Sequence, residues 1–190
     1  MSAHVLITNA ILYVFIPLWL LAGFGDWLFH RRTGISHNAG LKEAVLHQLM
    51  LAEVGLPLLA GLFLEINALL LALMIAGFLL HEATVLWDLR YASSRRTIAP
   101  GEQIVHSYQE LLPLILLTLV AVLHWDQFRA LLTLSGEARF VFEWKRDPLP
   151  AAYVWTVIVA GVLLIGIPYT EELWRCWRDR HGVPPLDTAQ

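Results

Sequence analysis

Acidic and histidine side chains recur in this sequence at a spacing that suits metal binding. Asp26 precedes His30 by four residues, and on a helix residues four apart lie on the same face. The same spacing recurs in two further pairs, Glu43 with His47 and Glu102 with His106. Each pair can direct one carboxylate and one imidazole at a single centre.

Two further groups extend this pattern. Glu110 follows His106 by four residues, and Asp88 follows His81 by seven, which returns to the same helix face. The chain has a single cysteine, Cys176, which excludes both an intramolecular disulfide and a thiolate cage. Mixed imidazole and carboxylate ligands suit iron, manganese or zinc.

The composition places these residues in a membrane protein. Of the 190 residues 57% are hydrophobic and 15% are charged, and the mean hydropathy is +0.59. A soluble domain has about a quarter of its residues charged, and a helix crosses the bilayer in about 20 residues. We therefore predict an all-α integral membrane protein with about five transmembrane helices, over residues 5–30, 41–64, 68–91, 102–124 and 151–175.

The remaining segments are short. Residues 126–150 mix charged, aromatic and aliphatic side chains, which predicts an outer loop with one short amphipathic helix on the bilayer surface. Residues 1–180 then form a single transmembrane domain, and residues 181–190 form a mobile polar tail.

Basic residues predict the orientation. With the N-terminus outside and the C-terminus cytoplasmic, the inner segments hold nine of them, Arg31, Arg32, Lys42, Arg90, Arg95, Arg96, Arg175, Arg178 and Arg180. The outer loop holds the other four, Arg129, Arg139, Lys145 and Arg146. This asymmetry follows the positive-inside rule.

Alternating helix direction brings the polar residues to one side of the membrane. The first and third spans end there and the second and fourth begin there, so we expect the first four helices to form a bundle around a polar site near the cytoplasmic face. Charged groups within spans cost about 2.5–3.5 kcal/mol each on insertion scales and need a functional reason. The predicted metal ligands are Asp26, His30, Glu43, His47, His81, Asp88, His106 and Glu110, and Glu53, Glu82 and Glu102 complete or tune the site.

An internal repeat is one interpretation of this pattern. Glu43, His47, Glu53 and Pro57 follow one another in the second span much as Glu102, His106, Glu110 and Pro113 do in the fourth. Two related helix hairpins would then each supply half of a site.

Simpler roles remain open for several residues. Glu43 and Glu102 stand in the first turn of a helix, where the dipole favours a carboxylate. Asp88 could pair with Arg90 or Arg95, and Arg96 could hold a phosphate or serve only for membrane orientation. Glu171 and Glu172 could close the site from the fifth span or reach water. The whole cluster could also be a metal-free proton or hydrogen-bond network.

The ligand chemistry resembles that of membrane di-iron desaturases and hydroxylases, which hold iron at the cytoplasmic face. Four helices that present Glu and His inward are also typical of di-iron carboxylate bundles. The resemblance implies oxygen chemistry on a lipid. The His-x-x-His-His boxes of the first class and the Glu-x-x-His pairs of the second are absent, and the spacing here is acid-x3-His.

The leading hypothesis is a membrane oxidoreductase with two metal ions, iron in the first place and zinc or manganese as alternatives. Its partners would be a membrane lipid or another apolar small molecule and an external electron donor. A zinc-dependent lipid hydrolase and a metal-handling or heme-binding protein are the alternatives. We expect no nucleic-acid partner, and the sequence leaves the oligomeric state open.

Overall fold

The computed structural model describes residues 1–182 and confirms a helical membrane protein. Five helices are long and apolar enough to cross a membrane, and they lie close to the predicted ranges. They are Ala3–Thr33, Leu41–Phe63, Ala68–Ser93, Pro100–Leu123 and Ala151–Arg178.

Shorter elements divide the first and last of these spans. In chain order the elements are α1 (Ala3–Ala10), η1 (Ile11–Phe15), α2 (Ile16–Thr33), η2 (Ile35–His37), α3 (Leu41–Phe63), α4 (Ala68–Ser93), α5 (Pro100–Leu123), α6 (Trp125–Thr133), α7 (Ala151–Gly161), η3 (Val162–Gly166), α8 (Ile167–Arg178) and η4 (Arg180–Gly182). Elements η1 and η3 are single π-helical turns, so α1–α2 and α7–α8 each form one continuous span.

Local sequence explains several helix boundaries. The Asn67 side chain accepts a hydrogen bond from the backbone N–H of Leu70 and caps the start of α4. Gly34 ends α2 in a left-handed conformation with φ 67°, which glycine adopts without steric cost. Pro100 stands in the first turn of α5, where its missing N–H is not needed.

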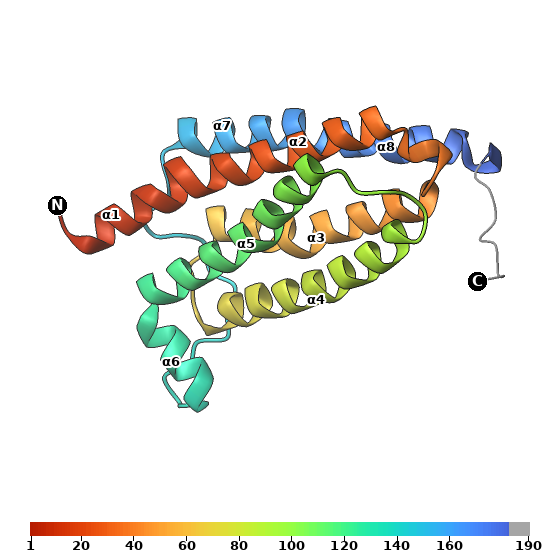
Figure 1. Cartoon of the computed structure of the whole chain (residues 1–190). Helices are drawn as coiled ribbons and strands as arrows, with labels where there is room; N and C mark the ends of the chain where they lie inside the picture. Colours follow the sequence, from red (N-terminus) through yellow and green to blue (C-terminus); the bar gives the residue numbers. More distant parts are fainter. Residues whose placement is uncertain (183–190) are drawn as a thin grey trace.

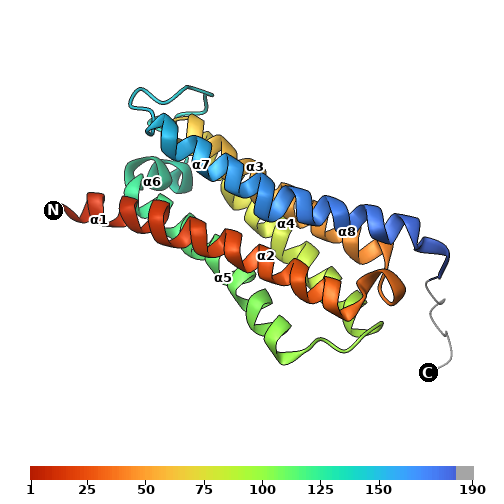
Figure 2. The same cartoon turned by 90° about the horizontal axis from the view of Figure 1, so that it is seen from above.

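The long helices run side by side with alternating direction (Figure 1). Seen from above, α2 lies between α5 and the α7–α8 span, while α3 and α4 lie beneath them (Figure 2). The end of α2, the start of α3, the end of α4 and the end of α8 meet at one end of the molecule, as the alternation predicts. The start of α5 lies towards the same end, beside α2.

Small residues allow α3 and α4 to pack closely. A Cβ atom on Gly77 of α4 would overlap the backbone carbonyl of Glu53 on α3, so only glycine fits there. Away from the polar end, a core of Ile11, Ile16, Leu62, Leu116 and Val157 fills the space between four spans. This apolar packing holds the helices in register.

The predicted outer loop contains α6, which accounts for the short helix expected there. The chain after α6 lies against the α3–α4 turn. The backbone N–H of Glu65 donates to the carbonyl of Glu143 at 2.9 Å, and that of Lys145 donates to the carbonyl of Phe63 at 2.9 Å. The loop therefore ties together the helix ends opposite the polar site.

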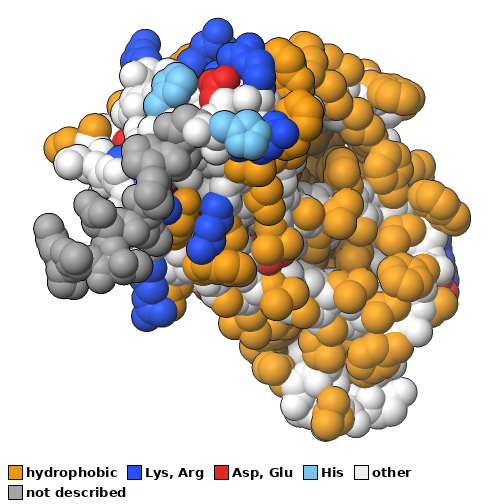
Figure 3. All heavy atoms as spheres, turned by 90° about the vertical axis from the view of Figure 1, so that its right-hand side faces the viewer, with side chains coloured by type: hydrophobic (Ala, Val, Ile, Leu, Met, Phe, Trp, Pro, Cys, Tyr) orange, Lys and Arg blue, Asp and Glu red, His pale blue; other side chains and the backbone are white. Residues whose placement is uncertain are grey.

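Basic side chains gather at the other end, where α2, α4 and α8 finish. Figure 3 looks onto this end and shows Lys, Arg and His side chains over one part of it, beside a largely hydrophobic surface. This distribution fits the predicted orientation, which stays a prediction. Of the predicted polar tail, residues 183–190 lie outside the described residues.

Candidate metal centre

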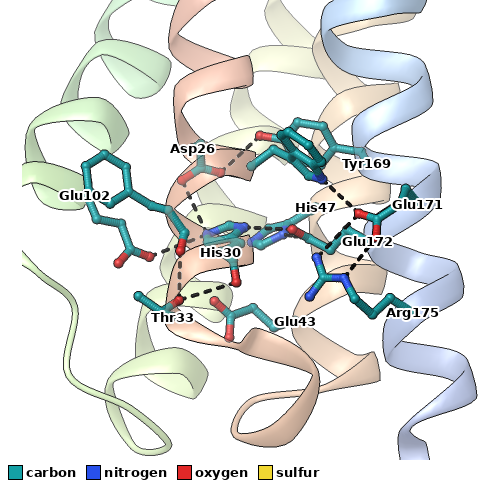
Figure 4. A network of polar contacts seen from close by, with 12 residues as sticks. Asp26, His30, Thr33, Glu43, His47, Glu102, Tyr169, Glu171, Glu172 and Arg175 are labelled. Atoms are coloured by element: carbon teal, nitrogen blue, oxygen red, sulfur yellow. Dashed lines mark hydrogen bonds and ion pairs between the residues drawn. The ribbon is translucent and has the colours of Figure 1, made fainter.

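Three of the four predicted histidine ligands lie together near this end. His30 on α2, His47 on α3 and His106 on α5 are buried among the helices (Figure 4 labels the first two). Acidic side chains surround them, and two groups of these residues could each hold a metal ion. The alternating helix direction inferred from the sequence therefore does bring the side chains together.

A carboxylate on the fifth span orients two of the imidazoles. Glu172 on α8 contacts His30 Nδ1 at 3.0 Å through one oxygen and His47 Nδ1 at 2.8 Å through the other. Because a carboxylate only accepts hydrogen bonds, both imidazoles must donate from Nδ1. When these imidazoles are neutral, their Nε2 atoms carry the lone pairs, as metal-binding histidines require.

The His30 and His47 rings stack face to face, with centroids 4.5 Å apart and planes 9° apart. Since both Nδ1 atoms point to the same carboxylate, both Nε2 atoms point to the opposite side. The His30 Nε2 atom is buried and makes no well-formed hydrogen bond. This arrangement offers neighbouring metal ligands, whereas a heme bound by two histidines would need axial nitrogens that face each other through its iron.

The first group consists of Asp26, His30, Glu102 and His106. Asp26 Oδ1 lies 2.8 Å from His106 Nε2 and 3.3 Å from His30 Nε2. Glu102 Oε1 lies 3.5 Å from His30 Nε2 and 4.0 Å from His106 Nε2. Neighbouring ligands of one tetrahedral ion at about 2.0–2.1 Å would be about 3.3 Å apart. The four distances bracket that value.

The second group consists of His30, Glu43 and His47, so His30 belongs to both. Asp88 on α4 adds a further carboxylate, because its Oδ2 lies 3.6 Å from His47 Nε2. The Oδ1 of Asp88 is buried and has no hydrogen-bond partner among the described residues. Asp88 therefore has one carboxylate oxygen without a hydrogen bond that could bind an ion.

Arg96 lies between the two groups. Its Nη2 is 2.6 Å from an oxygen of Glu43 and 2.6 Å from an oxygen of Glu102. Burial alone would lower the pKa of Arg96, but the hydrogen bonds to these two carboxylates outweigh it and raise the pKa above its ordinary value. Arg96 therefore stays charged and links the first turns of α3 and α5, so its position reflects more than membrane orientation.

The charges of the cluster do not balance. Five carboxylates are no more than 5% exposed, namely Asp26, Glu43, Asp88, Glu102 and Glu172. Against their five negative charges stands one buried guanidinium, that of Arg96, which leaves four negative charges if the imidazoles are neutral. Uncompensated charge is costly in a protein interior, so the balance must come from protonated imidazoles or from bound cations. Two divalent ions would supply four positive charges.

A tyrosine on the fifth span also contacts the cluster. The Tyr169 hydroxyl donates to Asp26 Oδ2 at 3.0 Å, and the side-chain amide of Gln109 donates to the Tyr169 oxygen at 3.1 Å. Asp26 thus has one oxygen turned to His106. Its other oxygen is held by Tyr169 (Figure 4). These bonds fix the direction in which Asp26 presents its carboxylate.

A cavity of about 440 Å³ adjoins the cluster. Its polar wall includes Asp26, His47, Asp88, His106 and Tyr169, and the rest of its lining is mostly apolar. His30 and the Glu172 carboxylate lie behind this wall and do not line the cavity. A molecule in the cavity would therefore meet only one side of the cluster.

Besides Asp88, four predicted residues lie outside the two groups. His81 and Glu110 line the cavity, and both ring nitrogens of His81 are buried without a well-formed hydrogen bond. Glu53 accepts a hydrogen bond from the Thr84 hydroxyl at 2.8 Å, and Glu82 is half-buried on α4. The structure does not bring these four side chains to the imidazoles of the other helices.

The sequence interpretation left the fifth span undecided. Glu172 reaches the histidines, while Glu171 binds Trp27, Arg31 and Arg175 outside the cluster. A helical stripe could have separated them, because Ile165, Tyr169, Glu172 and Cys176 recur at intervals of four and three residues and all are buried. Glu171 lies on the adjacent face.

Comparison with known protein families, with curated proteins and with solved structures gave no match to this chain. The function is therefore argued from the site alone.

Proposed function

We propose that the chain is a membrane metalloprotein with two metal ions, and that its activity is the oxidation of an apolar substrate at an iron pair. The observation that carries this proposal is the surplus of buried carboxylates around imidazoles whose Nε2 atoms are oriented outward by Glu172. With neutral imidazoles, the four unbalanced negative charges of the cluster would match two divalent ions. Buried His and carboxylate groups that could hold a metal fit a metalloprotein in general.

The ligand set supports iron. Three imidazoles and several carboxylates, without thiolate, form the nitrogen and oxygen environment in which di-iron proteins activate oxygen. His30 lies within reach of both groups, so two ions bound there would be neighbours. When bound, iron would supply oxidation of a C–H bond by O₂, with two electrons from an external donor and two protons, to give an alcohol and water.

The chain's own residues have separate tasks in this proposal. Glu172 holds His30 and His47 in one tautomer and one orientation. Tyr169 holds a proton at its hydroxyl, against Asp26, at the wall that a substrate would touch. The apolar walls of the cavity would position the substrate and keep water away from the cluster.

Elemental analysis of detergent-purified protein, with an absorption spectrum of the same sample, tests this proposal. We expect about two irons per chain and no Soret band. Lipid extracts of membranes that contain the protein should then yield an oxidised product that the matched empty membranes lack. A protein that binds no metal after purification without chelators and after reloading contradicts the proposal, and the cluster is then a proton or hydrogen-bond network.

The four-residue group also favours a second candidate, a zinc-dependent lipid hydrolase. Asp26, His30, Glu102 and His106 lie at distances suitable for tetrahedral zinc. Zinc activates water for hydrolysis of an ester, amide or phosphate bond. Colourless protein with stoichiometric zinc, and no spectral change upon reduction, supports this candidate over the iron enzyme.

A further inference from the structure

The cavity beside the cluster extends far along the helices. Its lining on α3 runs from His47 to Leu59, and on the α7–α8 span from Val157 to Tyr169. Twelve helical steps of 1.5 Å correspond to about 18 Å. One leaflet of the hydrocarbon core is about 15 Å deep. The cavity therefore has the length of a lipid chain within a single leaflet.

The polar and apolar parts of this cavity are separated. Towards the cluster it is lined by His47, Asp88, His106 and Tyr169, and its far end is lined by Trp19, Leu58, Leu59 and Val157. The walls between them are mostly apolar side chains and glycine backbone from α2, α3, α4 and the α7–α8 span. A ligand that matches both parts has a long apolar body and a polar group at one end only.

The charges of the lining decide what that polar end can be. Among the lining residues there is no lysine or arginine, whereas Asp26, Asp88 and Glu110 present carboxylates. Arg96 is engaged by Glu43 and Glu102 and does not reach the cavity. An anionic end, such as a carboxylate or phosphate, would meet repulsion in the metal-free protein. A cationic end would meet repulsion from the two divalent ions in the metal-loaded protein, so the test compares hexadecanoate in the metal-free protein and hexadecylamine in the metal-loaded protein.

Glycine and a π-helical turn shape one wall. Gly161 and Gly166 flank η3 and line the cavity, and a Cβ atom on Gly161 would enter open space. Single π-helical turns within α-helices are frequent at functional sites. Gly161 thus adds no side chain to this wall of the cavity, which leaves room for an apolar chain.

We infer that the cavity binds one single-chain lipid with a small uncharged polar end, such as a long-chain alcohol or aldehyde, with that end against His47, His106 and Tyr169. The inference names the substrate class of the proposed enzyme and rests on that proposal for the reaction. The binding itself requires no metal. Oxidation would then take place at the carbon atoms nearest the polar end.

Quenching of Trp19 tests this inference, because Trp19 lines the far end of the cavity. The probe is hexadecanol with bromine near the end of its chain, added to purified protein in detergent. We expect saturable quenching that disappears in the Trp19→Phe variant, which separates this signal from the other seven of the eight tryptophans. Hexadecanoate in the metal-free protein and hexadecylamine in the metal-loaded protein should displace the probe at least about tenfold less effectively than unlabelled hexadecanol.

Two cavity-filling variants control for the place of binding. Gly161→Phe should weaken probe binding at least about tenfold, since its ring enters the cavity. Gly55→Leu fills the opposite wall, where the nearest atom is Leu51 Cδ1 at 3.5 Å, and should act in the same way. Val159→Phe adds a ring to the same helix as Gly161 but on its lipid-facing side, and should leave binding unchanged.

The outcomes separate the two proposals. Equal or tighter binding of hexadecanoate or hexadecylamine, or unaltered probe binding in both glycine variants, overturns the substrate class. If metal-free protein binds the alcohol and no metal can be loaded, the binding inference stands and the oxidoreductase falls. If iron binds and the alcohol does not, the metal centre stands and the substrate class falls.

Discussion

Helices α3 and α5 contribute similar residues to the cluster but hold them in different ways. Glu43 and Glu102 are both fully buried in a first turn, and both lie 2.6 Å from Arg96. One turn later the histidines differ. His47 is held by Glu172 through Nδ1, whereas His106 contacts Asp26 through Nε2, the atom that would bind metal.

The cluster has an α3 half, with Glu43, His47 and Asp88, and an α5 half, with Asp26, Glu102 and His106. The difference between His47 and His106 shows that similar sequence patterns need not give equivalent half-sites. On α3 the imidazole is oriented from behind and its Nε2 is directed at Asp88. On α5 the metal-binding face is closed by Asp26 and must open by a small shift when an ion enters. The α3 half is therefore the more preorganised one. Whether the two hairpins are related copies stays a prediction.

The largest expected effect on bound metal comes from a change of His30, which lies between the two halves of the cluster. His30 lies within reach of both metal groups, so His30→Ala should remove a ligand of one ion and the ring stacked on His47, and bound metal should fall from about two ions to one or fewer. Elemental analysis of the purified variant measures this loss. His37→Ala, a change of the same kind in the η2 turn outside the cluster, is the matched control. Retention of both ions in His30→Ala would show that His30 is not a ligand.

Arg96→Gln should have the next largest effect, because it leaves Glu43 and Glu102 buried beside each other without their shared cation. Removal of one partner from a buried ion pair costs about 3–5 kcal/mol. Thermal unfolding of the metal-free protein in detergent measures the loss. Arg32→Gln, at an exposed arginine that follows the cluster on α2, should unfold like the unchanged protein. Equal melting temperatures for both variants would contradict the role of Arg96.

Glu172→Gln should weaken metal binding, mainly by His47 in the α3 half and by His30. An amide can accept from only one imidazole Nδ1–H through its oxygen, so the second imidazole loses its orientation. Loss of such a supporting carboxylate lowers metal affinity about 10–100-fold. Metal titration of chelator-treated protein measures this change. The same substitution one residue away, Glu171→Gln, should leave the affinity unaltered, because Glu171 contacts no histidine of the cluster.

Glu110→Gln should have the smallest effect on metal. The sequence pattern predicts Glu110 as a ligand, yet it lines the cavity and joins neither metal group. We expect an unaltered metal content by elemental analysis and weaker discrimination against hexadecanoate in the quenching assay. A clear loss of metal would show that Glu110 is a ligand and that the α5 half contains one more carboxylate than the structure indicates.

Much of the fold and part of the site could be predicted from the sequence. Hydropathy located the five spans, and helix alternation placed the acid–histidine pairs of α2, α3 and α5 at one depth. Rotation of a helix about its axis is harder to predict. In α8 two adjacent glutamates leave the inward face ambiguous unless the buried stripe of Tyr169 and Cys176 is recognised.

The role of Arg96 depended on tertiary structure. It lies in the connection between α4 and α5, and nothing in the local sequence distinguishes it from Arg95 as the partner of two acids on other helices. The positions of His81 and Glu110 also depend on tertiary structure. Both lie on the inner faces of their helices, but they are deeper along the cavity than the imidazoles that converge.

Metal analysis of His47→Ala and His106→Ala beside the unchanged protein tests the central claim most directly, namely that the α3 and α5 half-sites each hold one ion beside His30. The account predicts about two irons per chain in the unchanged protein and a sharp fall in each variant, to about one ion. His47→Ala should lose the ion of the α3 half, and His106→Ala that of the α5 half. Unchanged metal content in both variants would contradict the account.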